Sequence, residues 1–271
     1  MRRVFINEWK RAINISTVIA IIGVMFCICF DSWNDLIGAI QSGNTVWCVY
    51  YFTSNSAFGG MCRKYILPVF AVLPFATSFC EERNSRAVAY IVSREKMRIY
   101  GAVKYIVNIL MSGLVVAFGT VLLILFLRMR FPMTSDYYAT SVADTADLFH
   151  KWLAVYSPVR YCMTEAALGF MRGMIWAGAS MFASLYLTDR LVITMFSFFG
   201  SYVIVRISQM LSIDDKWRLD QILIGRTVVK DSGHTVMIAA IVSGVLVFLM
   251  GCAFTRKMVR GLKDGMFYES K

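Results

Sequence analysis

The chain has 271 residues, of which 58% are hydrophobic and 17% charged, with a formal net charge of +11. This composition excludes a soluble globular protein, whose surface must be covered largely by polar groups. It also excludes a disordered chain, which is poor in apolar residues. We therefore expect an all-α, polytopic integral membrane protein.

Six segments are apolar enough to cross a hydrocarbon core of ~30 Å as helices, which takes ~20 residues each. The predicted spans cover residues 14–30, 57–80, 105–127, 166–187, 191–211 and 236–254. The second is interrupted by Arg63 and Lys64 and should bend at Pro68 and Pro74. The first has the basic start of a signal peptide but no small-residue cleavage site, so we expect it to be retained. The chain thus divides into residues 1–13, a transmembrane domain over 14–255 and a basic tail over 256–271.

The distribution of Lys and Arg predicts the orientation. If the N-terminus is cytoplasmic, the segments on that side carry a net positive charge and the outer segments are neutral overall. This asymmetry follows the positive-inside rule and indicates a multi-pass protein of the cell (plasma) membrane with both termini in the cytoplasm. It argues against a basic surface for nucleic acid.

Residues 1–13 have apolar side chains at helical spacing and charged side chains in between. The apolar positions are Val4, Phe5, Trp9, Ala12 and Ile13. This pattern predicts an amphipathic helix in the headgroup plane with Trp9 as an anchor. The alternative is a basic topology signal with no further role.

Residues 81–104 alternate charge clusters with a short apolar stretch, and they hold more basic residues than a topology signal needs. Ser93 is a suitable N-cap for a helical turn. We expect two short cytoplasmic helices that form a docking surface for a partner. The residues assigned to that surface are Glu81, Glu82, Arg83, Arg86, Arg94 and Arg98.

The predicted outer loops, residues 31–56 and 128–165, are rich in Trp and Tyr. Such aromatic side chains are typical of segments at the headgroup level, and a substrate portal is the alternative. Arg172 and Arg206 fall inside predicted spans, where a charge is costly and indicates a functional site by default. Both could instead snorkel to the outer surface, so a place on a substrate path is one of two hypotheses.

No motif for chemistry is complete. The chain lacks the phosphate-binding pattern of nucleotide hydrolases, so any ATP hydrolysis must come from another polypeptide. His150 and His234 are isolated, no Cys-x-x-Cys pair occurs, and the odd number of cysteines argues against a full disulfide framework, although a bridge among Cys48, Cys62 and Cys162 is possible. We expect no metal, no cofactor and no catalytic residue in this chain.

The chain contains one match to an enzyme signature. Glu81-Glu82 followed by Arg86 has the Glu-Glu-x-x-x-Arg form of CAAX-processing intramembrane proteases. That family pairs these glutamates with histidines in Phe-x-x-x-His and His-x-x-x-Asn/Asp patterns. Neither His150 nor His234 fits them, and both lie on the predicted outer face. We therefore expect no protease.

The chain resembles the membrane subunit of an ABC exporter, the ABC-2-type permease family of bacteria. The resemblance is strongest over residues 65–116, where a Leu-Pro-rich span ends in Glu81-Glu82. A basic segment with Arg94, Tyr100 and Lys104 follows, and then a span with Asn108 and Gly113. The departure is Asn84-Ser85-Arg86-Ala87, where the family often has Gly.

The resemblance implies a fold and a set of partners. Residues 1–13 would be an elbow helix, and a coupling helix within residues 82–98 would dock on a separate ATP-binding subunit. Two permease subunits, identical or different, would enclose an export path through the lipid bilayer. The alternative from another class is a membrane immunity or sensor protein that binds a partner without transport.

Overall fold

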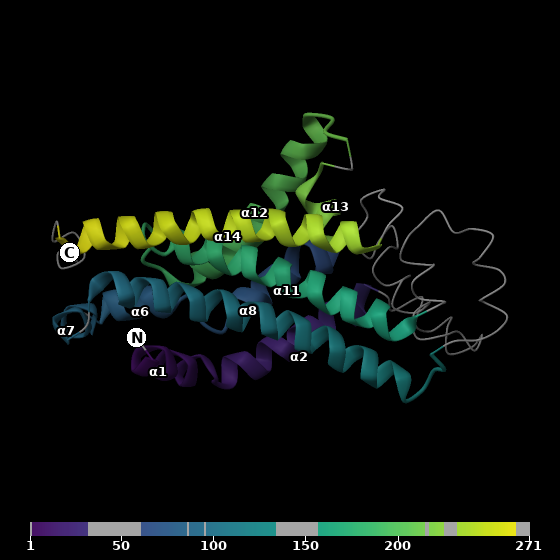
Figure 1. Ribbon diagram of the computed structural model, residues 1–271, viewed down its shortest axis with the longest axis horizontal. Helices are drawn as coiled ribbons and strands as arrows, with labels where there is room; N and C mark the ends of the chain where they lie inside the picture. Colours follow the sequence, from purple (N-terminus) through teal and green to yellow (C-terminus); the bar gives the residue numbers. More distant parts are fainter. Residues whose placement is uncertain are drawn as a thin grey trace.

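The computed structural model describes residues 2–31, 61–85, 87–94, 96–133, 157–214, 217–224 and 232–263. Every regular element in these ranges is a helix, in agreement with the predicted all-α class (Figure 1). The elements are α1 (Arg2–Ala12), α2 (Ile15–Asp31), η1 (Cys62–Ile66), α5 (Leu67–Val72), α6 (Ser78–Asn84), α7 (Ala87–Arg94), α8 (Met97–Arg128), α11 (Pro158–Ala183), α12 (Arg190–Met210), α13 (Leu219–Ile224) and α14 (Ser232–Lys263).

Three of the described helices are long and apolar enough to cross a membrane: α8, α12 and residues Val236–Leu262 of α14. A fourth candidate is the pair α1 and α2, which meet at a bend of 56°. The six predicted spans are therefore not all confirmed. The segment 57–80 is divided among η1, α5 and α6, and α11 is less apolar because it contains Arg172 and several small residues.

The bend between α1 and α2 is held by local hydrogen bonds. The Thr17 hydroxyl donates to the carbonyl oxygen of Ala12 at 2.7 Å, and the Thr17 amide donates to Asn14 Oδ1 at 3.1 Å. Asn14 thus serves as the cap that begins α2. The amphipathic helix predicted for residues 1–13 is present, but its apolar face, with Phe5 and Ala12, packs on Val103 and Val107 of α8.

The predicted second span is broken within the described residues. Pro74 lies in the turn between α5 and α6, where the absent amide proton of proline interrupts the helix. Pro68 occupies the first turn of α5, where proline is tolerated, so it begins an α-helix rather than bending one.

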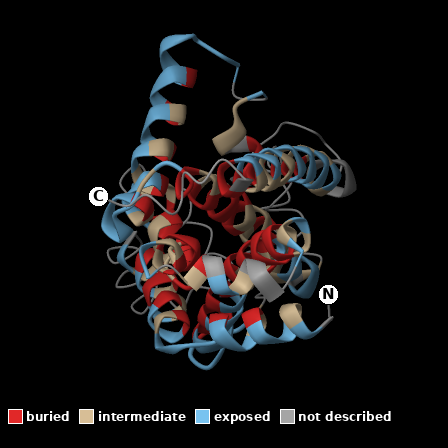
Figure 2. Cartoon of the chain, turned by 90° about the vertical axis from the view of Figure 1, so that its left-hand side faces the viewer, coloured by how far each residue is buried: buried red, intermediate tan, exposed pale blue. Residues whose placement is uncertain are grey.

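Helix α8 lies at the centre of the fold and packs against α11, α14, α2 and α1. The closest approach is to α11, because a Cβ built on Gly173 would lie only 2.6 Å from the carbonyl oxygen of Ser112. Small residues at such crossings let two membrane helices meet backbone to backbone. Viewed from one end, buried residues line the faces that the helices turn toward one another, and exposed residues lie outside (Figure 2).

One end of the bundle gathers α1, α6, α7, the Met97 end of α8 and the Lys263 end of α14, on the left of Figure 1. We call it the α7 end. Helix α12 runs obliquely, and its far end projects beyond the other helices (Figure 1). Cys62 and Cys162 carry no disulfide, and Cys48 lies outside the described residues, as do the aromatic residues of the predicted outer loops up to Tyr156.

Candidate functional site

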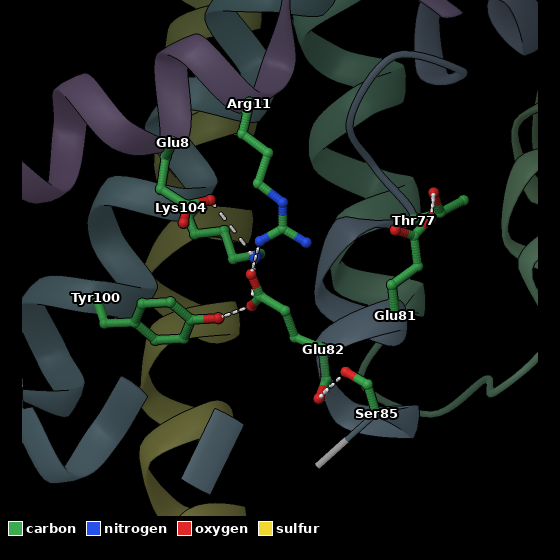
Figure 3. Close-up of polar contacts among 8 residues, drawn as sticks. All are labelled: Glu8, Arg11, Thr77, Glu81, Glu82, Ser85, Tyr100 and Lys104. Atoms are coloured by element: carbon green, nitrogen blue, oxygen red, sulfur yellow. Dashed lines mark hydrogen bonds and ion pairs between the residues drawn. The ribbon is translucent and has the colours of Figure 1, made fainter. Parts of the chain in front are cut away.

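Five polar side chains from three helices meet at the α7 end. The Glu82 carboxylate of α6 contacts the guanidinium of Arg11 from α1, and the ammonium of Lys104 and the hydroxyl of Tyr100 from α8 (Figure 3). Lys104 Nζ also lies 3.6 Å from Glu8 Oε2 of α1. We call these five residues the Glu82 network.

Helical spacing places the members of the network. Tyr100 and Lys104 are four residues apart on α8, and Glu8 and Arg11 are three apart on α1. Residues at these spacings share one face of a helix. Glu82 lies in the last turn of α6, so the network joins α1, α6 and α8 at a single carboxylate.

The network is buried. The Lys104 side chain has no exposed surface and that of Glu82 is 2% exposed, whereas Arg11 is 44% exposed. Two carboxylates face two cations, so the charges balance when all four are ionised. Burial by itself would raise the pKa of the Glu82 carboxyl, but the charges of Lys104 and Arg11 and the hydrogen bonds to it hold that pKa below its usual value.

Helix α7 follows α6 at the same end of the bundle as the network (Figure 1). Its Val88 is buried, and Val88 and Ile91 pack in one apolar cluster with Tyr100 and Met258. On the opposite side Tyr90 is 76% exposed. The helix is thus anchored by one face and presents an aromatic side chain on the other.

The structure separates the acidic residues predicted to dock a partner. Glu81 is 34% exposed, accepts a hydrogen bond from the Thr77 hydroxyl at 3.0 Å and lies 3.5 Å from Arg190. Its neighbour Glu82 points inward to the network, so its carboxylate is not on a surface that a partner could touch. The two adjacent glutamates therefore have different surroundings.

The four predicted basic docking residues are also divided. Arg83 donates to the carbonyl oxygen of Leu185 at 3.2 Å, which joins α6 to the segment after α11. Arg98 is exposed at the start of α8, and Arg94 is the last residue of α7. Arg86 lies outside the described residues.

Arg172 and Arg206, the two predicted intramembrane charges, differ in burial. Arg172 is 7% exposed and donates to the carbonyl oxygen of Leu223 at 3.5 Å. Arg206 is on the exposed side of α12, where its Nε donates to the Tyr202 hydroxyl at 3.2 Å and its guanidinium lies over the Tyr202 ring. They do not form one site.

The sequence analysis did not predict two buried groups of charged side chains, the Arg63–Glu165 pair and the Glu82 network. Arg63 Nη2 and Glu165 Oε2 are 2.8 Å apart in a buried pair between η1 and α11, which shares no residue with the Glu82 network. Tyr100 and Lys104 were identified as leading into the third predicted span and as part of the family resemblance, but no acidic partner was predicted for them. The usable signal was their four-residue spacing beside apolar neighbours, which places a cation inside the bundle and requires an acid opposite it.

Among the described residues no group of three His, Cys, Asp or Glu side chains is placed to hold a metal ion. No family model, no curated protein and no solved structure matches the chain.

Proposed function

We propose that this chain is the membrane-spanning subunit of an ABC-type exporter, driven by a separate ATP-binding subunit that docks on α7. The observation that carries the proposal is the mounting of α7. Its Val88 is buried in an apolar cluster that includes Tyr100 of α8 and Met258 of α14, its Tyr90 is exposed, and the Glu82 network joins the flanking helices α6 and α8. A short exposed helix held between two fixed helices is suited to receive force from a partner.

The same arrangement suggests how force would pass into the membrane. Helix α8 is continuous over 32 residues and begins next to α7. A push on α7 would move α6 and α8 together, because Glu82 and Lys104 bind them to each other and Arg11 binds them to α1. Tilting of α8 would then reach the far end of the bundle, where it packs against α2 and α11.

In this proposal the α7 end is cytoplasmic and two permease subunits enclose the path. Arg172 is the better candidate for a residue near that path, since it is buried beside a small cavity of about 30 Å³ lined also by Trp176 and Asp220. Arg206 on the exposed side of α12 would face lipid or the second subunit.

The test is reconstitution with the ABC-type ATPases encoded in the same genome, beginning with any that is encoded next to this chain. The wild-type chain should co-purify with the ATPase and stimulate its hydrolysis of ATP. Tyr90→Ala combined with Arg94→Glu should reduce both at least tenfold, because α7 would lose an exposed aromatic side chain and the charge of its last residue would be reversed. Phe199→Ala, which removes an aromatic residue that is 61% exposed on α12, is the control and should change neither.

Two outcomes would contradict the proposal. Co-purification and stimulation unchanged in the α7 double variant would mean that α7 is not the docking element. Binding of the ATPase without any stimulation by the wild-type chain would favour a membrane protein that binds a partner without transport.

A further inference from the structure

A large groove runs along the outside of the bundle between α8 and α14, which lie side by side in Figure 1. Its volume is about 960 Å³. It belongs neither to the Glu82 network nor to the exposed side of α7. Three arginines line its end nearest α7, namely Arg98, Arg256 and Arg260, and all three are exposed.

The rest of the groove is apolar. Its floor includes Tyr105, which is buried and donates a hydrogen bond to the carbonyl oxygen of Val247 at 2.8 Å, so the floor is fixed to α14. Ile106 and Phe248 form the walls and are 37% and 69% exposed. Gly244 opens the far end, because a Cβ built there would meet no atom within 4 Å.

The dimensions fit one leaflet of a bilayer. From Arg98 to Ile109, α8 rises ~16 Å, and from Arg256 to Gly244, α14 rises ~18 Å. The hydrocarbon half of a bilayer is ~15 Å thick. The arginines would therefore lie at the headgroup level while the apolar part extends toward the middle of the membrane.

The charge of the groove is of one sign. No Asp or Glu lines it among the described residues, and no ion pair is found there for Arg98, Arg256 or Arg260. Basic pockets between membrane helices bind the headgroups of anionic lipids, and arginine forms paired hydrogen bonds with phosphate. A small soluble phosphate would use the arginines but leave the apolar part unfilled.

We propose that the groove between α8 and α14 is a binding site for one anionic phospholipid, with the phosphate on Arg98, Arg256 and Arg260 and an acyl chain between Ile106 and Phe248. The proposal does not depend on the docking of an ATPase. It requires only that α8 and α14 cross a membrane with their arginine ends at one surface.

The test is native mass spectrometry of the full-length chain in detergent, titrated with phosphatidylglycerol or with phosphatidylcholine of the same acyl composition. The wild-type chain should retain phosphatidylglycerol in preference to phosphatidylcholine. Because each basic residue near an anionic headgroup contributes about fivefold, Arg256→Gln with Arg260→Gln should weaken retention roughly 25-fold. Arg3→Gln with Lys10→Gln removes two exposed cations of α1 and should weaken retention far less.

A second pair of variants tests the apolar part. Gly244→Phe should place a ring in the groove, because a Cβ there meets no atom within 4 Å, and should reduce retention of the lipid. Val245→Phe, one residue away at a position that does not line the groove, should not. These variants leave the arginines in place, so the proposal is tested even if the arginine variant fails to fold.

Three results would overturn the proposal. The first is equal retention of the two lipids by the wild-type chain. The second is displacement of phosphatidylglycerol by millimolar inorganic phosphate, which would indicate a phosphate site without a lipid. The third is a change in the ratio of dimer to monomer in the groove variants with unchanged lipid retention, which would assign the groove to a second copy of the chain.

Discussion

The Glu82 carboxylate binds three helices together at one point, and its importance rests on the cation opposite it. Lys104 is fully buried, so removing the charge of Glu82 would leave two cations, Lys104 and Arg11, facing the single carboxylate of Glu8. Loss of one partner of a buried ion pair costs about 3–5 kcal/mol, whereas an exposed pair is worth about 0–1 kcal/mol. Adjacent glutamates in the sequence should therefore differ greatly in their effect on stability.

We predict that Glu82→Gln lowers the free energy of unfolding by about 3–5 kcal/mol, and that Glu81→Gln lowers it by at most about 1 kcal/mol. Thermal unfolding of the detergent-solubilised variants measures the difference. The double variant Glu82→Gln with Lys104→Met should recover part of the loss, because the excess buried positive charge is then removed. Equal effects of the two single variants would contradict the buried role of Glu82.

Acid should weaken the same network. The folded state holds the pKa of Glu82 below its ordinary value of 4.5, so the stabilisation is complete above pH 4.5 and is lost as the pH falls through the lowered pKa. The advantage of the wild-type chain over Glu82→Gln in melting temperature should therefore be constant from pH 7 to pH 5 and shrink at lower pH. A constant difference down to pH 3 would contradict this.

At the scale of the elements, the crossing of α8 and α11 depends on glycine. A Cβ on Gly173 would lie 2.6 Å from the carbonyl oxygen of Ser112 and 3.0 Å from Cα of Gly113, and backbone atoms cannot yield as a flexible side chain can. By contrast a Cβ on Gly244 of α14 would meet no atom within 4 Å. Substitution by alanine should therefore destabilise the chain at Gly173 and leave its stability unchanged or raised at Gly244.

We predict that Gly173→Ala destabilises the chain by about 1–3 kcal/mol through overpacking. Gly244→Ala should be neutral or stabilising by up to about 1 kcal/mol, because alanine favours a helix over glycine. The melting temperatures of the two purified variants, compared with that of the wild-type chain, measure these changes in stability. A stabilising Gly173→Ala would mean that the helices lie further apart than the structure places them.

The sequence predicted individual helices well but did not predict which residues contact one another between helices. The break at Pro74 and the amphipathic helix at residues 1–13 follow from local rules and agree with α5, α6 and α1. Glu82 was assigned to a docking surface because it belongs to the charge clusters of residues 81–104, which hold more basic residues than a topology signal needs. Its contact with Arg11 joins residues 71 apart in the chain, and no local pattern contains that information.

For the whole molecule, the apolar composition predicted an all-helical chain with membrane-spanning helices, and the described residues form helices of which three or four are long and apolar enough to cross a membrane. The six predicted spans are not all confirmed, since three described helices, or four if α1 and α2 form one span, are long and apolar enough to cross a membrane. The segment 57–80 is instead a chain of short helices, and α11 replaces large apolar residues with glycine and serine where it packs on α8. Both differences come from packing among helices, about which a hydropathy profile contains no information.

The orientation of the chain in the membrane is the basis of the proposed coupling, and it can be measured directly. A single cysteine at Ser93, in a chain whose seven native cysteines are replaced, is treated in intact cells with a membrane-impermeant maleimide. A cysteine at Ser141, in a predicted outer loop, is the control. We predict that Ser93→Cys reacts only after the cells are permeabilised, whereas Ser141→Cys reacts at once. Reaction of Ser93→Cys from outside intact cells would place α7 on the wrong side for an ATPase and contradict the account.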